Sequence, residues 1–241
     1  MKTSVQEKEF AHDPWLTKLF EREVYKIQVA ESLKESALET LKALQEKPVF
    51  LFAKVDTGDL LTAAFFEERG FRLVDTNVVF EKSLNPKVGL VGSASLRFAR
   101  AEDEETVSGL AARNSTTSRF HLDPLIPRRV ADTVKSEWVR NYFCGTRGDQ
   151  MIVALIQERV VGFLQLLLGR DNVATIDLIA TDHRERRRGI ASDMIGFLEI
   201  QHPHFSRIRV GTQISNTASL RLYEKLGFRV VSSQYVFHFY R

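Results

Sequence analysis

Arg186-Arg187-Arg188-Gly189-Ile190-Ala191, called the arginine turn below, stands between a predicted strand and a predicted helix. The strand is residues 174–180, which alternate polar and apolar side chains and then turn apolar. The helix begins at or just after Gly189, because apolar residues recur from Ile190 at helical spacing. The first N–H groups of a helix lack intrahelical partners, and the helix dipole adds partial positive charge there. With guanidinium groups alongside, the turn predicts a site for a pyrophosphate or clustered phosphates.

Two other interpretations of this basic run remain open. Residues 183–188 contain four arginines, and such a run is often a solvated turn or part of a nucleic-acid surface. Nucleic-acid binding requires basic residues spread over a face, with aromatic rings between them. Here the charges are confined to one strand-to-helix turn, so an anion site on that turn is the favoured interpretation.

Length and composition are those of an ordinary soluble globular protein. The 241 residues are 44% hydrophobic and 27% charged, which is enough for one large domain or two small ones. Because 34 basic residues are nearly matched by 31 acidic ones, the net charge of +3 gives no argument for a polyanionic partner. The N-terminus shows no apolar leader, and no stretch approaches about eighteen consecutive apolar residues. We expect a cytoplasmic protein with neither a membrane nor a nucleic-acid partner.

Cysteine and histidine give little support to a metal site. Cys144 is the one cysteine, which excludes an internal disulfide and a cysteine metal cluster and suits a reducing compartment. We expect its side chain to be a small buried apolar group rather than a nucleophile. The stretch His202-Pro203-His204 would need further ligands to bind a metal and is predicted to be a surface turn. No metal is expected.

The chain divides into two α/β units. The polar stretch 83–89 contains Pro86 and is the best linker candidate, so a boundary is predicted near residue 90. In the first unit the expected elements are strand 25–30, helix 32–46, strand 49–55, helix 59–69 and strand 71–80. In the second they are strand 96–101, helices 102–114 and 130–143, strands 151–156 and 160–168, the elements flanking the arginine turn, strand 208–212, helix 216–226 and strand 230–239. Strands crossed by helices indicate an α/β or α+β fold.

An internal repeat connects the two units. Residues 65–74 align with residues 222–231 with five identities over ten positions, and each copy has the pattern of a helix end, a glycine cap and a strand. Generic capping chemistry could produce such a match, but a strand of similar length also precedes both copies. The first copy has no basic glycine turn, and Phe66 stands where the second copy has Tyr223. We therefore expect a chemically silent first half.

Residues 95–241 resemble the GCN5-related N-acetyltransferase (GNAT) superfamily. Its acetyl-CoA loop, Gln/Arg-x-x-Gly-x-Gly/Ala, is matched by Arg186, Gly189 and Ala191, and its closing helix is similar to the stretch from Asn216 to Phe228. The resemblance implies a GNAT fold with a mixed central sheet flanked by helices. It implies a catalytic domain at residues 95–241 after a degenerate, truncated GNAT-like domain at residues 1–90. It also implies acetyl-CoA as co-substrate and direct attack of an amine on the thioester.

A closer resemblance is to the dTDP-fucosamine acetyltransferase group, which acetylates a 4-amino-4,6-dideoxy sugar on a nucleotide carrier. It is carried by the truncated first half, the segment 118–124 and the ending 210–218. It implies a nucleotide-sugar acceptor. The candidate substrate contacts are Ser118, Arg119 and His121. Another small amine, an antibiotic or a protein N-terminus is the alternative acceptor, and a non-catalytic CoA-binding or scaffolding module is the alternative to an enzyme. A homodimer is one assembly that would be compatible.

The superfamily resemblance also assigns roles to single residues. Ile179, Ala180 and Thr181 would hold the pantetheine arm as an added strand, although this segment could be plain core strand. Tyr223 would protonate the departing thiolate, unless it is an amphipathic core tyrosine. Asn216 would hydrogen-bond the pantetheine amide, and asparagine is also a preferred N-cap residue. The CoA phosphates would lie against Arg186, Arg187, Arg188, Gly189, Ile190 and Ala191.

A general base cannot be assigned from the sequence. Asp177 lies on the expected strand, but a half-exposed strand aspartate is more often structural, and water could accept the proton instead.

Overall fold

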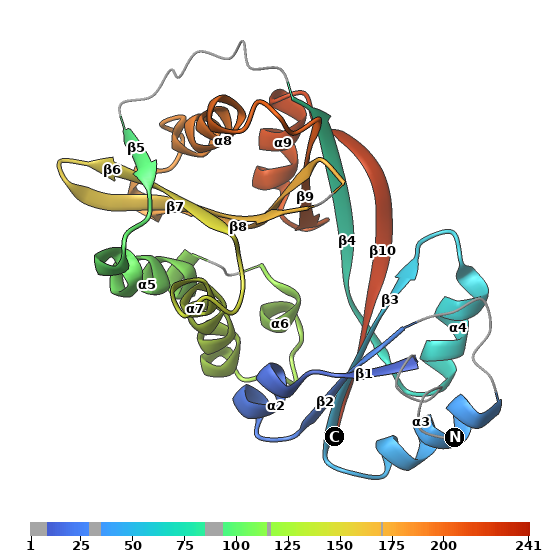
Figure 1. Cartoon of the computed structure of the whole chain (residues 1–241). Helices are drawn as coiled ribbons and strands as arrows, with labels where there is room; N and C mark the ends of the chain where they lie inside the picture. Colours follow the sequence, from blue (N-terminus) through green and yellow to red (C-terminus); the bar gives the residue numbers. More distant parts are fainter. Residues whose placement is uncertain (1–8, 29–34, 85–93, 115–116, 170) are drawn as a thin grey trace.

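The computed structural model describes residues 9–28, 35–84, 94–114, 117–169 and 171–241 (Figure 1). The strands are β1 (Phe10–His12), β2 (Glu23–Ile27), β3 (Val49–Asp56), β4 (Arg72–Ser83), β5 (Ser95–Phe98), β6 (Gln150–Ile156), β7 (Arg159–Leu168), β8 (Val173–Thr181), β9 (Arg207–Gln213) and β10 (Arg229–Tyr240). The α-helices are α2 (Pro14–Phe20), α3 (Glu35–Gln45), α4 (Leu60–Glu68), α5 (Glu104–Asn114), α6 (Arg119–Leu122), α7 (Arg128–Phe143), α8 (Ile190–Gln201) and α9 (Thr217–Lys225), with short 3₁₀ turns η1 (Ala101–Asp103) and η2 (His183–Glu185). β1, α2 and α6 were not predicted from the sequence.

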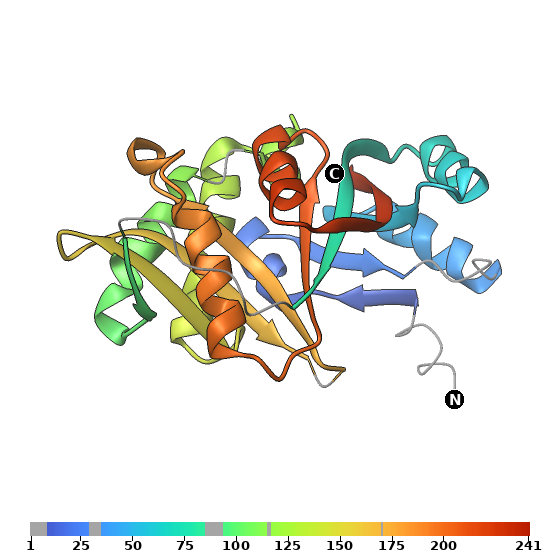
Figure 2. The same cartoon turned by 90° about the horizontal axis from the view of Figure 1, so that it is seen from above.

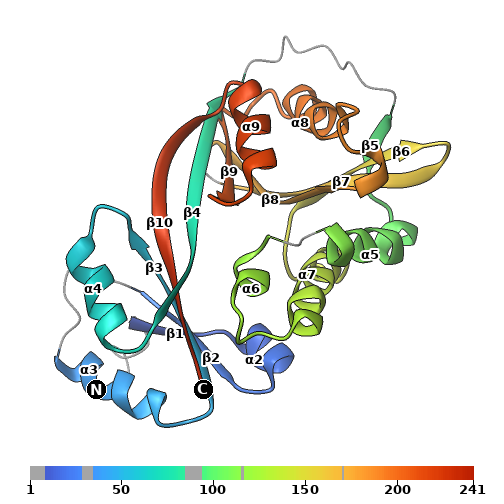
Figure 3. The same cartoon turned by 180° about the vertical axis from the view of Figure 1, so that it is seen from behind.

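The strands join one mixed sheet in the order β1-β2-β3-β10-β4-β9-β8-β7-β6-β5. The pairs β2–β3 and β8–β9 are parallel, and the other neighbouring pairs are antiparallel. In Figures 1 and 3, α8 and α9 cover one face of the part formed by β5 to β9, and α5 and α7 cover the other. β6 and β7 are buried on both faces, which explains their nearly continuous apolar sequences. The predicted α/β architecture, a mixed central sheet flanked by helices, is confirmed.

The centre of the sheet alternates between the N-terminal half (residues 1–90) and the C-terminal half (residues 95–241). Across the sheet, β3 and β4 of the first half interleave with β10 and β9 of the second. β10 pairs antiparallel with both β3 and β4, and β4 also pairs antiparallel with β9. The long strands β4 and β10 run side by side through the middle of Figures 1 and 2. The last strand of each half therefore lies between two strands of the other half.

The caps of α4 and α9 reproduce the internal repeat in three dimensions. Gly70 and Gly227 both adopt left-handed backbone, with φ of 76° and 83°, a conformation that favours glycine because it has no Cβ. The matching hydrogen bonds that close the caps are Phe71 N–H to the carbonyl of Phe66 at 3.0 Å and Phe228 N–H to the carbonyl of Tyr223 at 2.9 Å. The repeat predicted from the sequence is thus a repeat of local structure as well.

Aromatic packing follows the same repeat. Phe66 on α4 stacks on Phe237 of β10, with ring centroids 5.6 Å apart. Tyr223 on α9 packs against Phe80 of β4 at 5.7 Å. Each helix therefore packs on the strand that comes from the other half, so that burial of apolar rings ties the two halves together.

The division into domains 1–90 and 95–241 remains a proposal, and the predicted boundary near residue 90 lies outside the described residues. The expectation of a buried Cys144 was wrong: this residue is exposed and follows the last residue of α7. A helix end leaves its last carbonyls without intrahelical partners, and such ends commonly face water. No helix in the described part of the chain combines the length and apolar character needed to cross a membrane.

Candidate active site

A cleft opens where two parallel strands separate. β8 pairs with β9 from Val173 to Ile176 only, although β8 continues to Thr181 and β9 to Gln213. The cleft has a volume of about 360 Å³ and is lined by residues 175–179 on one side and 210–213 on the other. Beyond Ile176, no described strand pairs with this edge of β8. Its backbone N–H and C=O groups can therefore pair with an extended ligand that adds as a strand.

A β-bulge shapes the β8 wall of the cleft. The register of β7 and β8 shifts between Gln165, which pairs with Leu178, and Leu166, which pairs with Ile176, so Asp177 is the extra residue. The Asp177 carboxylate accepts hydrogen bonds from Arg147 at 2.6 and 2.8 Å, and further ones from Trp138 Nε1 at 2.8 Å and Gln165 Nε2 at 3.2 Å. These bonds occupy both oxygens. Asp177 therefore fixes the bulge, which agrees with its structural interpretation.

Tyr223 lies on the opposite side of the same cleft. Its side chain is 2% exposed, packs on Phe80 and Phe228, and contributes to the cleft lining. Burial raises the pKa of the phenol well above its usual value. The hydroxyl therefore stays protonated at neutral pH and can donate a proton. Both interpretations of Tyr223 fit this position, because the ring belongs to the core while the residue also lines the cleft.

Asn216 begins the helix that carries Tyr223. Its side-chain oxygen accepts a hydrogen bond from Ser219 N–H at 3.3 Å, which makes it the N-cap of α9. Asn216 and Ser219 also line the cleft. The N-cap interpretation is therefore confirmed, and the position is compatible with a second contact to a ligand in the cleft.

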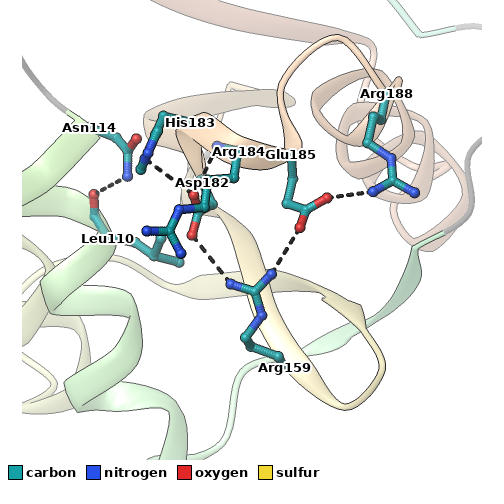
Figure 4. Close-up of polar contacts among 8 residues, drawn as sticks. All are labelled: Leu110, Asn114, Arg159, Asp182, His183, Arg184, Glu185 and Arg188. Atoms are coloured by element: carbon teal, nitrogen blue, oxygen red, sulfur yellow. Dashed lines mark hydrogen bonds and ion pairs between the residues drawn. The ribbon is translucent and has the colours of Figure 1, made fainter.

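The arginine turn follows β8 and ends in α8 (Figure 4). Glu185 accepts hydrogen bonds from Arg159 at 2.8 Å and from Arg188 at 2.5 Å, which ties the turn to β7. Gly189, with φ of 81°, is the N-cap of α8 and places no side-chain cap on the first helical turn. The predicted helix start is confirmed. Because the first N–H groups lack a side-chain cap and lie beside exposed arginines, this turn fits a phosphate group.

Arg186 connects the turn to the mouth of the cleft. Its Nη2 donates to the side-chain oxygen of Asn114 at 3.4 Å, and Asn114 lines the cleft. Figure 4 shows Asn114 at the end of α5, beside η2. A ligand running along the free edge of β8 would therefore reach the arginine turn from inside the cleft.

The segment 118–124 contributes a chain of polar side chains. Ser118 Oγ lies 2.7 Å from His121 Nδ1, and His121 Nε2 lies 3.0 Å from Asp132 Oδ1. Ser118 lines the cleft, whereas the His121 side chain is only 4% exposed and lies behind it. His121 thus contacts a residue of the cleft without lining the cleft itself, and its role as a substrate contact stays a prediction.

The floor of the cleft carries cations that the sequence analysis missed. Lys54, Arg119 and Lys135 line the cleft, from β3, α6 and α7. Burial lowers the pKa of Lys54 and of Lys135 to about 8. The sequence feature that could have revealed Lys54 is its position as a lysine inside the otherwise apolar run of β3. Arg119 alone was named beforehand.

The structure brings many of the predicted residues together. Five of them line one cleft: Ser118, Arg119, Ile179, Asn216 and Tyr223. The remaining predicted cofactor contacts lie further along β8 and in the turn after it, namely Ala180, Thr181, Arg186, Arg187, Arg188, Gly189, Ile190 and Ala191.

Comparisons with known proteins show what this region is similar to. Residues 117–228 match the acetyltransferase (GNAT) family. Spore coat polysaccharide biosynthesis protein SpsD of Bacillus subtilis (strain 168) is 35% identical over 139 residues, which are 56% of this chain and 47% of SpsD. The chain thus spans about half the length of this curated relative.

Solved structures share the fold over both halves. A functionally unknown conserved protein from Staphylococcus epidermidis superposes with a TM-score of 0.64 at 13% identity, covering 90% of this chain and 83% of that one. A GCN5-related N-acetyltransferase from Sphaerobacter thermophilus gives 0.61 at 15% identity, covering 90% and 72%. A tandem GNAT protein from the clavulanic acid biosynthesis pathway gives 0.60 at 13% identity, covering 90% and 75%. At these identities the likeness establishes the fold alone.

Proposed function

We propose that this chain, whose residues 117–228 match the acetyltransferase (GNAT) family, transfers an acetyl group from acetyl-CoA to a primary amine. The acceptor proposed is the amino group of a nucleotide-linked 4-amino-4,6-dideoxy sugar. The observation that carries the transferase function is the cleft between β8 and β9, which combines a free strand edge with a buried tyrosine.

The two parts of acetyl-CoA meet different groups of the chain. The pantetheine arm pairs with the free edge of β8 near Ile179 and Thr181, as an added strand would. Its phosphates lie against the arginine turn, where guanidinium groups and the uncapped N–H groups of α8 can hold them. These contacts bind and orient the thioester next to Tyr223, which lowers the barrier by bringing the reactants together.

Acetyl transfer forms one bond, breaks one bond and moves one proton, in net, from the amine nitrogen to the departing sulfur. The amine nitrogen forms a bond to the thioester carbonyl carbon, and the carbon–sulfur bond breaks. Backbone N–H groups of the β8 edge can polarise the carbonyl. Tyr223 then donates its phenolic proton to the departing thiolate, while the proton lost by the amine passes to solvent and restores the phenol.

The choice of a sugar acceptor rests on two supports. SpsD is named for spore coat polysaccharide biosynthesis, which involves carbohydrate chemistry. The segment 118–124, which carries the resemblance to acetyltransferases of nucleotide-linked amino sugars, contributes Ser118, Arg119 and Phe120 to the cleft. A cationic acceptor such as a polyamine is less well suited, because Lys54, Arg119 and Lys135 would repel it.

The test is a panel of acceptor amines assayed with acetyl-CoA by release of free thiol. Turnover of dTDP-4-amino-4,6-dideoxyhexoses in preference to peptides and aminoglycosides supports the proposal. A preference for peptides or aminoglycosides would overturn the acceptor and leave the CoA chemistry standing. Calorimetry supplies the second arm, since absence of binding at millimolar CoA or acetyl-CoA would exclude the transferase function itself.

A further inference from the structure

We propose that Lys54, Arg119 and Lys135 form a second anion site, on the floor of the cleft, that binds the diphosphate of the acceptor rather than that of acetyl-CoA. The three residues are called the cation floor below. The inference deepens the proposed function and rests on it for the identity of the acceptor. The existence of an anion site in this place follows from the geometry of the cleft alone.

The cation floor is built by both halves of the chain. Lys54 on β3 and Asp75 on β4 are both paired with Val236 of β10, so all three side chains lie on one face of the sheet. Val236 lines the cleft between them. α6 and α7, which carry Arg119 and Lys135, belong to the other half, and in Figures 1 and 3 α6 lies between the C-terminal sheet and the β4–β10 pair. The interleaved strands of the two halves thus bring cations that are far apart in the sequence to one cavity.

Arg119 is held in a fixed orientation. Its Nη1 donates to His238 Nε2 at 3.0 Å, while His238 Nδ1 donates to Asp123 Oδ2 at 2.8 Å. Burial lowers the pKa of His238 to about 4, so the ring is neutral and its Nε2 can accept. The guanidinium carbon also lies 4.0 Å from the ring centre of Phe52 and 4.3 Å from that of Phe120. This support positions the guanidinium without neutralising it.

The cations of the cation floor form no ion pair with a carboxylate in the part of the chain that the structure describes. Among the described residues, none of the three side chains has a carboxylate oxygen within 4.0 Å. Asp75 acts on Lys54 and Arg119, Asp13 acts on Arg119, and Asp177 acts on Lys135, all through longer-range attraction only. Asp177 already accepts hydrogen bonds from Arg147, and Asp75 Oδ1 is buried without a hydrogen-bond partner. Desolvated cations are costly unless an anion pairs with them. A cavity lined by several such cations is therefore suited to a group with more than one negative charge, as a diphosphate has.

The cation floor and the arginine turn are separate sites. The turn lies beyond the end of β8 at the mouth of the cleft, next to Asn114, whereas Lys54 lies on β3, across β10, β4 and β9 from β8. Residues of the turn do not line the cleft. A CoA molecule held by the turn consequently leaves the cation floor available, and the reacting amine would stand between the two anion sites.

The test is a calorimetric titration of thymidine 5′-diphosphate into the full chain saturated with CoA, so that the arginine turn is already occupied. We expect binding to the wild type, and about tenfold or more weaker binding to Lys54→Met and to Lys135→Met. Arg129→Met, on the exposed side of α7, is the matched control and should bind as the wild type does. Inorganic pyrophosphate should compete for the site and thymidine should not, which separates recognition of the anion from recognition of the base.

A kinetic arm separates this inference from the proposed function. With a nucleotide-linked amino sugar, Lys54→Met should raise the KM for the acceptor about tenfold or more. With the methyl glycoside of the same amino sugar, the variant should match the wild type. Equal effects on both acceptors, or diphosphate binding that neither variant weakens, would overturn the inference. Lysine-dependent diphosphate binding without turnover of any amino sugar would instead overturn the acceptor proposed above and leave the anion site standing. Melting temperatures check that each variant is folded.

Discussion

Tyr223 is the residue on which the proposed chemistry most depends. Its phenol stays protonated because burial raises the pKa, so replacing it by phenylalanine removes a proton donor while keeping the ring that packs on Phe80 and Phe228. We expect Tyr223→Phe to lower kcat by about 10²- to 10⁴-fold and to leave acetyl-CoA affinity nearly unchanged. Steady-state kinetics and calorimetry measure the two effects. A loss of melting temperature with the rate retained would show that the residue serves packing alone.

Phe66 provides the internal control, because it occupies the same place in the silent copy of the repeat. Its side chain is fully buried and packs on Phe71 and Phe237. Phe66→Ala should destabilise the chain by about 3–5 kcal/mol, through lost burial and the cavity left behind. Denaturant unfolding measures this loss. A rate per folded molecule close to that of the wild type is expected, and a specific loss of kcat would show that the first half takes part in the chemistry.

Lys54 and Lys135 should make the stability of the folded protein depend on pH. Their pKa values in the folded protein are about 8, below the unfolded value near 10.5, so the folded state binds fewer protons between these limits. The wild type should therefore gain stability as the pH rises from about 8 to about 10.5, relative to the double variant Lys54→Met/Lys135→Met. Thermal unfolding of both proteins across this range measures the difference. A constant difference in melting temperature would contradict the burial of these charges.

The arginine turn should govern affinity for acetyl-CoA more than turnover. Arg187→Ala combined with Arg188→Ala removes phosphate contacts that are remote from the reacting carbon, so KM should rise with a smaller change in kcat. Arg187 is in left-handed backbone with φ of 64°, so Arg187→Gly removes the charge without adding strain. An unchanged KM in both proteins would place the CoA phosphates elsewhere.

Gly189 is less informative as a target than the sequence suggests. A bulky residue there would crowd a phosphate bound at the turn. The observed φ of 81° strains any residue that has a Cβ, whatever space surrounds it. A kinetic defect in Gly189→Val would therefore report a distorted turn as readily as a blocked phosphate, which makes the arginine variants the better test.

Helices and strands with a regular spacing of apolar residues were predictable from the sequence, whereas the order in which the strands pair was not. Strand β8 and helices α7 and α8 follow from local patterns of apolar residues that the structure reproduces within one or two residues. The four-residue helix α6 has too few residues to show a period. The place of β10 between β3 and β4 depends on contacts between halves far apart in sequence, which no local pattern records.

The part of the site that belongs to one local motif was predictable from the sequence, and the part that depends on contacts between the two halves was not. Tyr223, Asn216 and the arginine turn stand at fixed places around one strand and one helix, so a motif could locate them. Lys54 belongs to an apolar strand of the first half. Its role in the site depends on β3, α6 and α7 meeting at one cavity. The sequence therefore predicted the part of the site proposed for acetyl-CoA and Arg119 of the cation floor, but it missed Lys54 and Lys135.

For the whole molecule, the interleaved strands predict that the C-terminal half will not fold alone. A fragment of residues 95–241 would lose β4 from between β9 and β10, leaving β9 with an unpaired edge. Exposed strand edges of this kind favour aggregation. We expect the fragment to be unfolded or aggregated by circular dichroism and size-exclusion chromatography, and co-expression with residues 1–94 as a separate chain to restore a soluble complex.

A monomeric, well-folded fragment 95–241 with normal thiol release would contradict this prediction. It would show that residues 95–241 fold without β4 and form an independent domain. If the two fragments fail to associate, the two halves must be joined in one chain in order to fold.

The interleaving of β4 and β10 also bears on how a gene of this kind can change. A duplicated segment that loses its reactive groups would ordinarily be free to erode and then be deleted. Here the first half, which we expect to be chemically silent, supplies β4, the strand that joins β9 and β10 into one sheet. Selection for the proposed reaction would therefore preserve both halves, because loss of the first half would also remove a strand that the second half needs.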